Sequence, residues 1–188
     1  MPLTTPFHSR LEEINQTKIW KNWSGYLTAP QYQYSLSSEY YSVRNSVSLL
    51  DTSPLFKYRF VGTDAGTLLE LILLRDVGQC ELGRAQYTCW CDERGFVLQD
   101  GLVMQVNPGE YLLTAAEPTL RYFRKVTKEK GLTAVRVEDI SSEFGILSLQ
   151  GPEAFNVITQ LSENAGSLSY FGVMKTEIAG REVTISRT

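Results

Sequence analysis

Residues 86–106 read QYTCWCDERGFVLQDGLVMQV, and they decide the fold because two apolar segments flank one turn. The tetrapeptide Asp92-Glu93-Arg94-Gly95 is typical of a tight turn, since Asp and Gly adopt turn conformations easily. Residues 86–91 and 97–106 are rich in the aromatic and β-branched side chains that strands favour. The stretch therefore predicts two antiparallel strands joined by a short turn.

The segments around this pair continue the pattern. Asn107-Pro108-Gly109 predicts another turn, which leads into a strand at 111–115. Residues 55–61 alternate between aromatic side chains and others, which predicts a half-buried strand. Helices are expected at 37–47, from an N-cap at Thr63 to residue 73, at 118–130 and from residue 151, and further strands at 133–138, 144–149, 172–178 and 182–187. Helices among antiparallel strands predict the α+β class.

The composition excludes several classes of protein. The chain has 188 residues, 43% hydrophobic and 21% charged, with a net charge of -3, enough for one large domain or one domain plus part of another. Without a basic excess we expect neither a nucleic acid nor a membrane as partner. The N-terminus lacks signal-peptide features, and the longest aliphatic run, 68–74, falls far short of the roughly 20 residues that a membrane span needs. We expect a cytoplasmic protein.

Histidine and cysteine are too few for a metal centre. His8 is the one histidine and lies near the N-terminus, so a zinc site or a Ser-His-Asp triad is not expected. Cys89 and Cys91 share one side of their predicted strand, but only Cys80 is left to help them. We interpret them as adjacent buried thiols in a reducing compartment.

The block RNSVSLLDTS at residues 44–53 and four blocks further along the chain together resemble the glycine-cleavage T-protein (aminomethyltransferase) family. Residues 44–53, RNSVSLLDTS, are similar to the family's Arg-x-Ser-x-Gly-Leu-Phe-Asp-x-Ser segment, with Ser48 in place of Gly. The other blocks are GRAQYT at 83–88, DERG at 92–95 followed by Asp100, LQGP at 149–152, and SRT at 186–188, which matches the start of the family's Arg-Thr-Gly-Tyr-Thr-Gly-Glu signature. No block is specific alone, but together they extend across nearly the whole chain.

The resemblance implies a folate-binding, aminomethyltransferase-like fold within a longer, three-domain protein. We expect residues 1–50 to belong to the folate-binding core, 51–140 to form an α+β domain, and 141–188 to begin a second α+β domain. The last predicted strand runs into Thr188 without a closing element. The chain is therefore expected to be a fragment, truncated before the C-terminal part of the family's fold.

Asp100 is the candidate catalytic residue. It lies between apolar segments, so we expect a carboxylate with apolar neighbours, where an unpaired charge costs several kcal/mol. The family's motif here is Asp-Asp, and its second Asp, regarded as catalytic, aligns with Asp100, while Gln99 replaces the first. Near N10 of a folate, such a carboxylate accepts or orients a proton, or stabilises positive charge on the one-carbon unit. An ordinary surface or turn aspartate is the alternative.

The resemblance also implies contacts with tetrahydrofolate as co-substrate. Tyr87 and Tyr170 match family positions that contact folate, and a flat pterin or aminobenzoate ring stacks well on tyrosine. Leu55 and Met104 are the expected apolar walls. Since the chain has 10 tyrosines, an ordinary packed tyrosine is the alternative for either position.

The expected function is that of an enzyme, a tetrahydrofolate-dependent aminomethyl- or methyltransferase whose donor is a small molecule or a lipoyl-protein. The alternative is a non-catalytic folate-binding module of a larger dehydrogenase or of an iron–sulfur assembly protein. Pro54-Leu55-Phe56 stands where T-proteins carry His-Met-Gly, which leaves the donor open. A third alternative is that this piece alone binds nothing well, because part of the family's folate pocket lies beyond Thr188.

Overall fold

The computed structural model describes every residue from Met1 to Thr188, and the chain forms two compact units. Unit 1 consists of Met1–Leu55 and Ser141–Gly166, and unit 2 of Phe56–Ile140 and Ser167–Thr188. Each unit is therefore built from two separate pieces of chain. Helices accompany mainly antiparallel sheets, which confirms the predicted α+β class. The division at residues 50 and 140 stays a prediction about domains.

Unit 2 is built on a five-stranded antiparallel sheet. Its strands, in spatial order, are β6 (Ala85–Cys91), β7 (Val97–Asn107), β8 (Glu110–Ala115), β5 (Phe56–Val61) and β9 (Arg136–Asp139). The hairpin predicted from residues 86–106 is β6 and β7, with Tyr87 opposite Leu102 and Cys89 opposite Asp100. The prediction of this hairpin is thus confirmed.

The turn of the hairpin is organised by Asp92. Its Oδ1 accepts hydrogen bonds from the backbone N–H groups of Arg94 (2.9 Å) and Phe96 (3.0 Å). The bond from Phe96 contributes most to holding the pKa of the Asp92 carboxyl below its ordinary value. The turn prediction rested on this property of aspartate, whose side chain accepts hydrogen bonds from backbone N–H groups that follow it in the chain.

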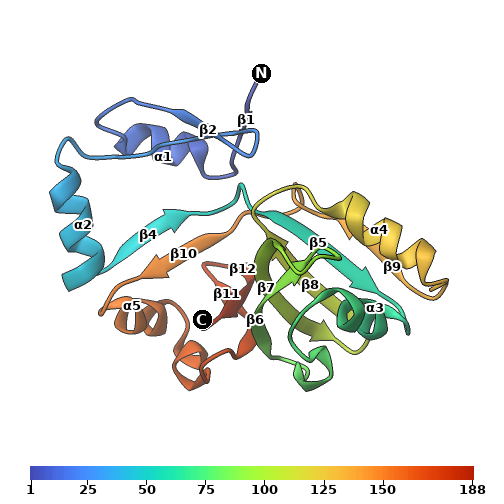
Figure 1. Ribbon diagram of the computed structural model, residues 1–188. Helices are drawn as coiled ribbons and strands as arrows, with labels where there is room; N and C mark the ends of the chain where they lie inside the picture. The colour runs from blue at the N-terminus through green and yellow to red at the C-terminus, as the bar shows by residue number, and fades with distance from the viewer. The chain divides into compact units, whose positions relative to one another are not determined.

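One face of the sheet is covered by α3 (Ala65–Ile72) and α4 (Leu120–Glu129), which Figure 1 shows beside it. The Phe123 ring of α4 lies 5.2 Å from the rings of Tyr58 and Phe60 and 5.8 Å from that of Trp90. These side chains have no exposed surface, and Leu68 of α3 joins them. The aromatic side of the strand predicted at 55–61 therefore faces the core.

The start of α4 is attached to this core by a buried hydrogen bond. The backbone N–H of Thr119, the residue before the helix, donates to the hydroxyl of Tyr58 at 2.8 Å. Burial raises the pKa of the Tyr58 hydroxyl, although the bond from Thr119 opposes the rise. The hydroxyl thus serves as a neutral acceptor for an N–H group that the helix itself leaves unbonded.

We expect Tyr58→Phe to lower the free energy of unfolding by about 1–3 kcal/mol, because it leaves the buried Thr119 N–H without an acceptor. Urea titration followed by circular dichroism measures the change. Tyr40→Phe removes a hydroxyl from a side chain that is 58% exposed, and it should have little effect. Equal stability of the two variants would contradict the assignment.

The C-terminal part of unit 2 lies against the start of β6. It forms the hairpin β11 (Val173–Ile178) and β12 (Arg181–Ser186). The Ala85 N–H donates to the Phe171 carbonyl at 2.8 Å, and the Val173 N–H donates to the Gly83 carbonyl at 2.7 Å. The chain before β11 is therefore fixed beside the edge strand of the sheet.

Unit 1 contains two small sheets and three α-helices. Its elements are β1 (Leu3–Thr4), β3 (Tyr26–Thr28) and β2 (Lys21–Trp23) in one sheet, β10 (Leu147–Gln150) and β4 (Ser48–Asp51) in the other, and the helices α1 (His8–Ile14), α2 (Leu36–Asn45) and α5 (Ala154–Leu161). Figure 1 shows β4 and β10 side by side. The Thr5 hydroxyl donates to Asp51 Oδ2 at 2.6 Å, which connects the N-terminal segment to β4.

The sequence predictions for unit 1 were less complete than those for unit 2. The helix predicted at 37–47 ends at Asn45, because Ser46 leaves the helical conformation and β4 begins at Ser48. The strands β1 to β4 and helix α1 were not predicted. In unit 2, Asp64 rather than Thr63 precedes α3, so the predicted N-cap was wrong.

Candidate functional site

The site residues on β6 and β7 lie on the face of the sheet opposite α3 and α4. Thr88 and Trp90 are buried toward the core, so their neighbours Tyr87 and Cys89 point to the other side. Residues directly opposite each other in an antiparallel pair share a face, which brings Asp100 to the same side as Cys89. We call this side the outer face.

Two of the predicted site residues are in direct contact on the outer face. The Tyr87 hydroxyl donates a hydrogen bond to Asp100 Oδ2. That bond, followed by the negative charge of Asp100, raises the pKa of the Tyr87 hydroxyl above its ordinary value. The phenol therefore stays protonated at neutral pH and holds one carboxylate oxygen, leaving the other oxygen of Asp100 available.

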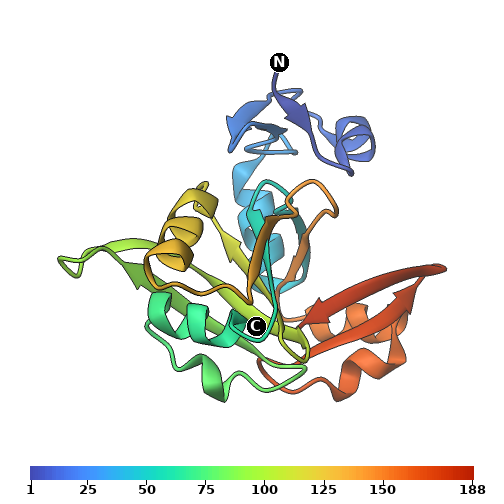
Figure 2. The same cartoon turned by 90° about the vertical axis from the view of Figure 1, so that its right-hand side faces the viewer.

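The expectation of a buried carboxylate was wrong, because Asp100 is exposed. The preceding residues Phe96, Val97 and Leu98 are also exposed, by 63%, 63% and 46%. The reason is the length of β7, whose residues 97–100 extend beyond its register with β8, which begins at Val103, and reach the turn of the hairpin with β6. Figure 2 shows this end of the hairpin extending past the helices.

The Tyr87 hydrogen bond predicts a change in titration. A raised folded pKa means that the bond stabilises the fold fully below the unfolded value, near 10.0, and that this contribution disappears as pH rises through the folded pKa. Asp100→Asn should bring the Tyr87 pKa down toward that ordinary value. The alkaline absorbance difference between each protein and its Tyr87→Phe derivative isolates this one tyrosine, and an unchanged titration would contradict the contact.

Gly101 allows the neighbouring strand to approach next to Asp100. A Cβ atom at this position would lie 1.9 Å from the Thr114 carbonyl oxygen, which no side chain tolerates. The Leu102 N–H also donates to Thr114 Oγ at 3.0 Å. The position of Asp100 thus depends on close contact between the backbones of β7 and β8.

Gly101→Ala should destabilise the chain by about 1–3 kcal/mol or more, because strands β7 and β8 must separate. Gly66→Ala is the matched control, since its Cβ would meet only the Tyr111 hydroxyl at an ordinary 3.5 Å. Within helix α3 the control should be neutral or stabilising by about 0.4–1 kcal/mol. Thermal unfolding of both variants tests the difference, and similar melting temperatures would refute it.

The other predicted residues are placed by different elements. Met104 lies opposite Ala85, half-buried, and alternates along β7 onto the face of Asp100. Tyr170 precedes Phe171 in the segment fixed beside β6, and it is 62% exposed. Leu55 is half-buried and is the last residue of the first piece of unit 1. Tyr87, Asp100 and Met104 are therefore the predicted residues that the sheet brings to one face.

Gln99 makes a structural hydrogen bond, and the three cysteines differ in their exposure. The Gln99 side-chain oxygen accepts from the Glu117 N–H at 3.0 Å, which connects β7 to the chain after β8. Cys89 and Cys91 are reduced and half-exposed, so the expectation of buried thiols was wrong for both, whereas Cys80 is buried. No group of three or more His, Cys, Asp or Glu side chains has an arrangement that would hold a metal ion.

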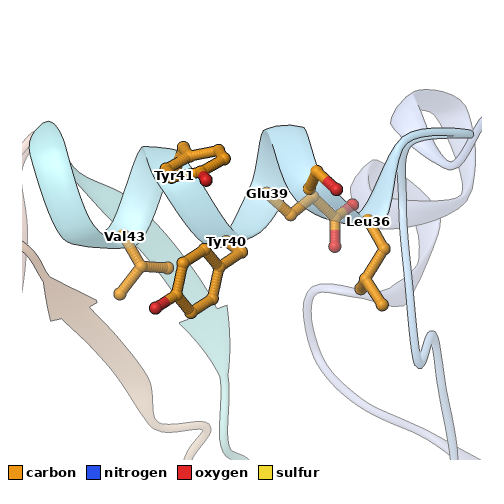
Figure 3. A pocket seen from close by; sticks show the side chains of 6 residues that line it. Leu36, Glu39, Tyr40, Tyr41 and Val43 are labelled. Atoms are coloured by element: carbon orange, nitrogen blue, oxygen red, sulfur yellow. The ribbon is translucent and has the colours of Figure 1, made fainter.

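A separate apolar groove lies on α2 in unit 1. Figure 3 shows Leu36, Tyr40 and Val43 along one side of the helix and Glu39 among the lining residues. The Glu39 carboxylate accepts hydrogen bonds from the backbone N–H groups of Tyr32 and Gln33, each at 2.7 Å, so it has a structural role. A groove lined by a single helix, with its one acid already bonded, offers no group for catalysis.

Comparison with known proteins establishes the family. The sequence profile of the GCVT N-terminal domain matches residues 9–188, nearly the whole chain. The chain belongs to this family. The resemblance to the T-protein found in the sequence motifs is thus confirmed.

Two named proteins are similar in sequence to this chain. The chain is 30% identical to an aminomethyltransferase of Listeria monocytogenes over 190 residues, which cover 99% of this chain and 51% of that protein. It is also 30% identical, over 168 residues, to the heme-dependent oxidative N-demethylase gamma subunit of Ectopseudomonas mendocina, covering 89% of this chain and 44% of that one. The chain spans about half the length of the curated relatives that it matches.

Solved structures show the same fold. The glycine cleavage system aminomethyltransferase T from Bartonella henselae matches with a TM-score of 0.78 at 19% identity, covering 94% of this chain and 48% of that chain. A chain of the heterotetrameric sarcosine oxidase from Corynebacterium sp. U-96 matches with a TM-score of 0.50 at 20% identity, covering 75% and 70% respectively. The GCVT-type fold predicted from the motifs is confirmed. No helix of this chain has both the length and the apolar character that crossing a bilayer requires.

Proposed function

We propose that this chain is the folate-binding part of a tetrahydrofolate-dependent aminomethyl- or methyltransferase in which Asp100 is the catalytic residue. The single observation that carries the proposal is the hydrogen bond from the Tyr87 hydroxyl to the Asp100 carboxylate on the outer face. It supports the proposal because a carboxylate held by one oxygen is oriented while the other oxygen remains able to act on a proton.

The residues around this pair suit a reduced folate. Tyr87 and Tyr170 are 54% and 62% exposed, so each offers the face or edge of its ring to a flat pterin or aminobenzoate group. Met104 adds a flexible apolar side chain on the face of Asp100. Aromatic, apolar and carboxylate groups together form the kind of surface that recognises a ring bearing ionisable nitrogens.

Tetrahydrofolate, when bound as co-substrate, supplies the amine nitrogen that receives the one-carbon unit. The Asp100 carboxylate would accept or orient the proton that this nitrogen loses, or stabilise positive charge on the carbon during transfer. The Tyr87 hydroxyl would keep the carboxylate in one orientation. Because both side chains are exposed, the partner that supplies the carbon can approach the same face.

The donor in this proposal is a small molecule or a lipoyl-protein. A donor screen would test lipoyl-bound aminomethyl groups, sarcosine, dimethylsulfoniopropionate and aromatic methyl ethers, with the appearance of one-carbon-loaded folate as the readout. Pro54 removes the polar side chain that T-proteins carry at this position, so we expect a donor other than the lipoyl-bound group to give the highest rate. The expected location is the cytoplasm.

Asp100→Asn should reduce the rate of one-carbon transfer by roughly a hundredfold or more, since it removes the proton acceptor while keeping the size of the side chain. Binding of tetrahydrofolate, measured by isothermal titration calorimetry, should change little. The measurements use the 188-residue chain and, where its gene encodes more, the full product. Glu93→Gln is the matched control, because Glu93 is an exposed acid in the turn of the same hairpin.

Two results would count against the proposal. If Asp100→Asn turns over as fast as the unsubstituted protein, Asp100 has no catalytic role. If Glu93→Gln loses as much transfer activity as Asp100→Asn, the effect comes from net charge and not from the position of Asp100. Absence of tetrahydrofolate binding to the full, unsubstituted gene product would exclude the folate-dependent function as a whole.

A second candidate is a non-catalytic folate-binding module within a larger redox enzyme or an iron–sulfur assembly pathway. It is favoured by the relatives that are parts of larger assemblies, the N-demethylase gamma subunit and a chain of the heterotetrameric sarcosine oxidase. For such a module, tetrahydrofolate binding would persist without turnover of any donor, and co-purification would recover a redox subunit.

A further inference from the structure

Phe171, the residue after Tyr170, has a backbone conformation that side chains rarely adopt. Its φ is +58°, and it is the one aromatic residue among the four non-glycine residues with a positive φ. For a bulky side chain this left-handed conformation is strained, because Cβ lies too close to the neighbouring backbone. Strain of this kind persists where the surrounding structure enforces it, and it is concentrated at functional sites.

A tight turn requires this conformation of Phe171. The Gly172 N–H donates to the Ser169 carbonyl at 2.8 Å, so Tyr170 and Phe171 are the two central residues of the turn. A positive φ at the second central position is usually supplied by glycine or asparagine, which adopt it at little cost. The chain therefore has a phenylalanine at a position where the geometry favours glycine.

Both backbone groups of Phe171 are bonded to neighbouring segments of unit 2. Its N–H donates to the Arg187 carbonyl at 2.6 Å, and its carbonyl accepts from the Ala85 N–H at 2.8 Å. Ala85 lies on the same side of β6 as Tyr87, two residues further along the strand. The turn is thus fixed next to the strand of the candidate site, and its bonds keep Phe171 in the strained conformation.

The side chains of the two central residues are in contact. The centroids of the Tyr170 and Phe171 rings are 4.5 Å apart, with an interplanar angle of 54°. Consecutive side chains of an extended strand point to opposite sides, so this contact depends on the turn. Phe171 is half-buried, whereas Tyr170 is 62% exposed. The strained backbone therefore places a partly buried ring against a ring that is open to a ligand.

We propose that Phe171 positions the Tyr170 ring for contact with the folate, an inference that rests on the proposed function. An exposed tyrosine otherwise samples several rotamers, and a ligand that stacks on it loses affinity by stopping that motion. The Phe171 ring restricts Tyr170 in the free protein, so the bound orientation exists before the folate arrives. Because Phe171 acts through Tyr170, its substitution should change folate affinity and leave the rate of the chemical step unchanged.

The test measures tetrahydrofolate affinity of the full gene product by isothermal titration calorimetry. Phe171→Gly should weaken binding by roughly two- to tenfold, the usual cost of immobilising one side chain, and should raise KM for tetrahydrofolate with kcat unchanged. Phe171→Tyr keeps the ring and should restore the affinity. Ala179→Gly is the matched control, because Ala179 also has a positive φ, +51°, but lies in the turn between β11 and β12. The control should bind like the unsubstituted protein.

A double variant separates positioning from direct contact. In a protein that already carries Tyr170→Ala, the further change Phe171→Gly should leave the affinity as it is, since no ring remains to be held. A further loss of the same size in that background would overturn the inference, because Phe171 would then contact the folate itself or support the fold in general. Unchanged affinity in Phe171→Gly, or an equal loss in Ala179→Gly, would overturn it as well.

Fluorine NMR of protein that contains ring-fluorinated tyrosine needs neither a ligand nor a folded Phe171 variant. The resonance that disappears in Tyr170→Phe belongs to Tyr170. We expect it to lie away from the random-coil position, because the Phe171 ring is close, and to be as broad as the resonances of buried tyrosines. A narrow line at the random-coil position would show a freely moving ring and overturn the inference.

The two proposals fail in different ways. Absence of tetrahydrofolate binding to the full, unsubstituted gene product would reject the proposed function together with the inference. Binding that Phe171→Gly does not weaken would reject the inference alone and leave the proposed function in place.

Discussion

The alternation of side chains across the five-stranded sheet is the constraint on which the rest of unit 2 depends. Trp90 is fully buried against Phe123, so the residues before and after it on β6 must point away from the core. Cross-strand pairing then places Asp100 on the same outer face as Cys89. A shift of register by one residue would bury the carboxylate and expose the tryptophan. The core that stabilises the sheet thus also selects the face available for chemistry.

The contact between Tyr87 and Asp100 orients the carboxylate more than it stabilises the fold. Both residues are exposed, and hydrogen bonds between exposed groups contribute little to stability because water competes for them. What the contact does supply is direction, since one oxygen of the carboxylate is occupied and the other is not. The close approach of Thr114 to Gly101 sets the backbone from which this carboxylate projects. Strand packing therefore sets the backbone from which the carboxylate projects, and the hydrogen bond from Tyr87 sets which carboxylate oxygen is occupied.

The hairpin of β6 and β7 was predicted from a strong local signal, and the short strand β4, whose partner is distant in sequence, was not predicted. The hairpin of β6 and β7 contains its own turn, organised by Asp92, so pattern and pairing lie within one short stretch. β4 of unit 1 has no such signal: its Asp51 pairs with Leu147 of β10, far along the chain. Short strands of this kind are defined by their partners rather than by their own residues.

The family, the α+β class and the candidate carboxylate at Asp100 were determined by the sequence itself, because turn residues, periodicity and motif order are local properties of the chain. Only the tertiary structure decided which side chains are exposed. It leaves Asp100 exposed on the outer face, and it buries Lys57, which alternation places on the polar side of β5. It also fixes the loop of Tyr170 beside Arg84 through backbone bonds to β6. Exposure and contact between distant segments depend on where other strands end, and no local pattern contains that information.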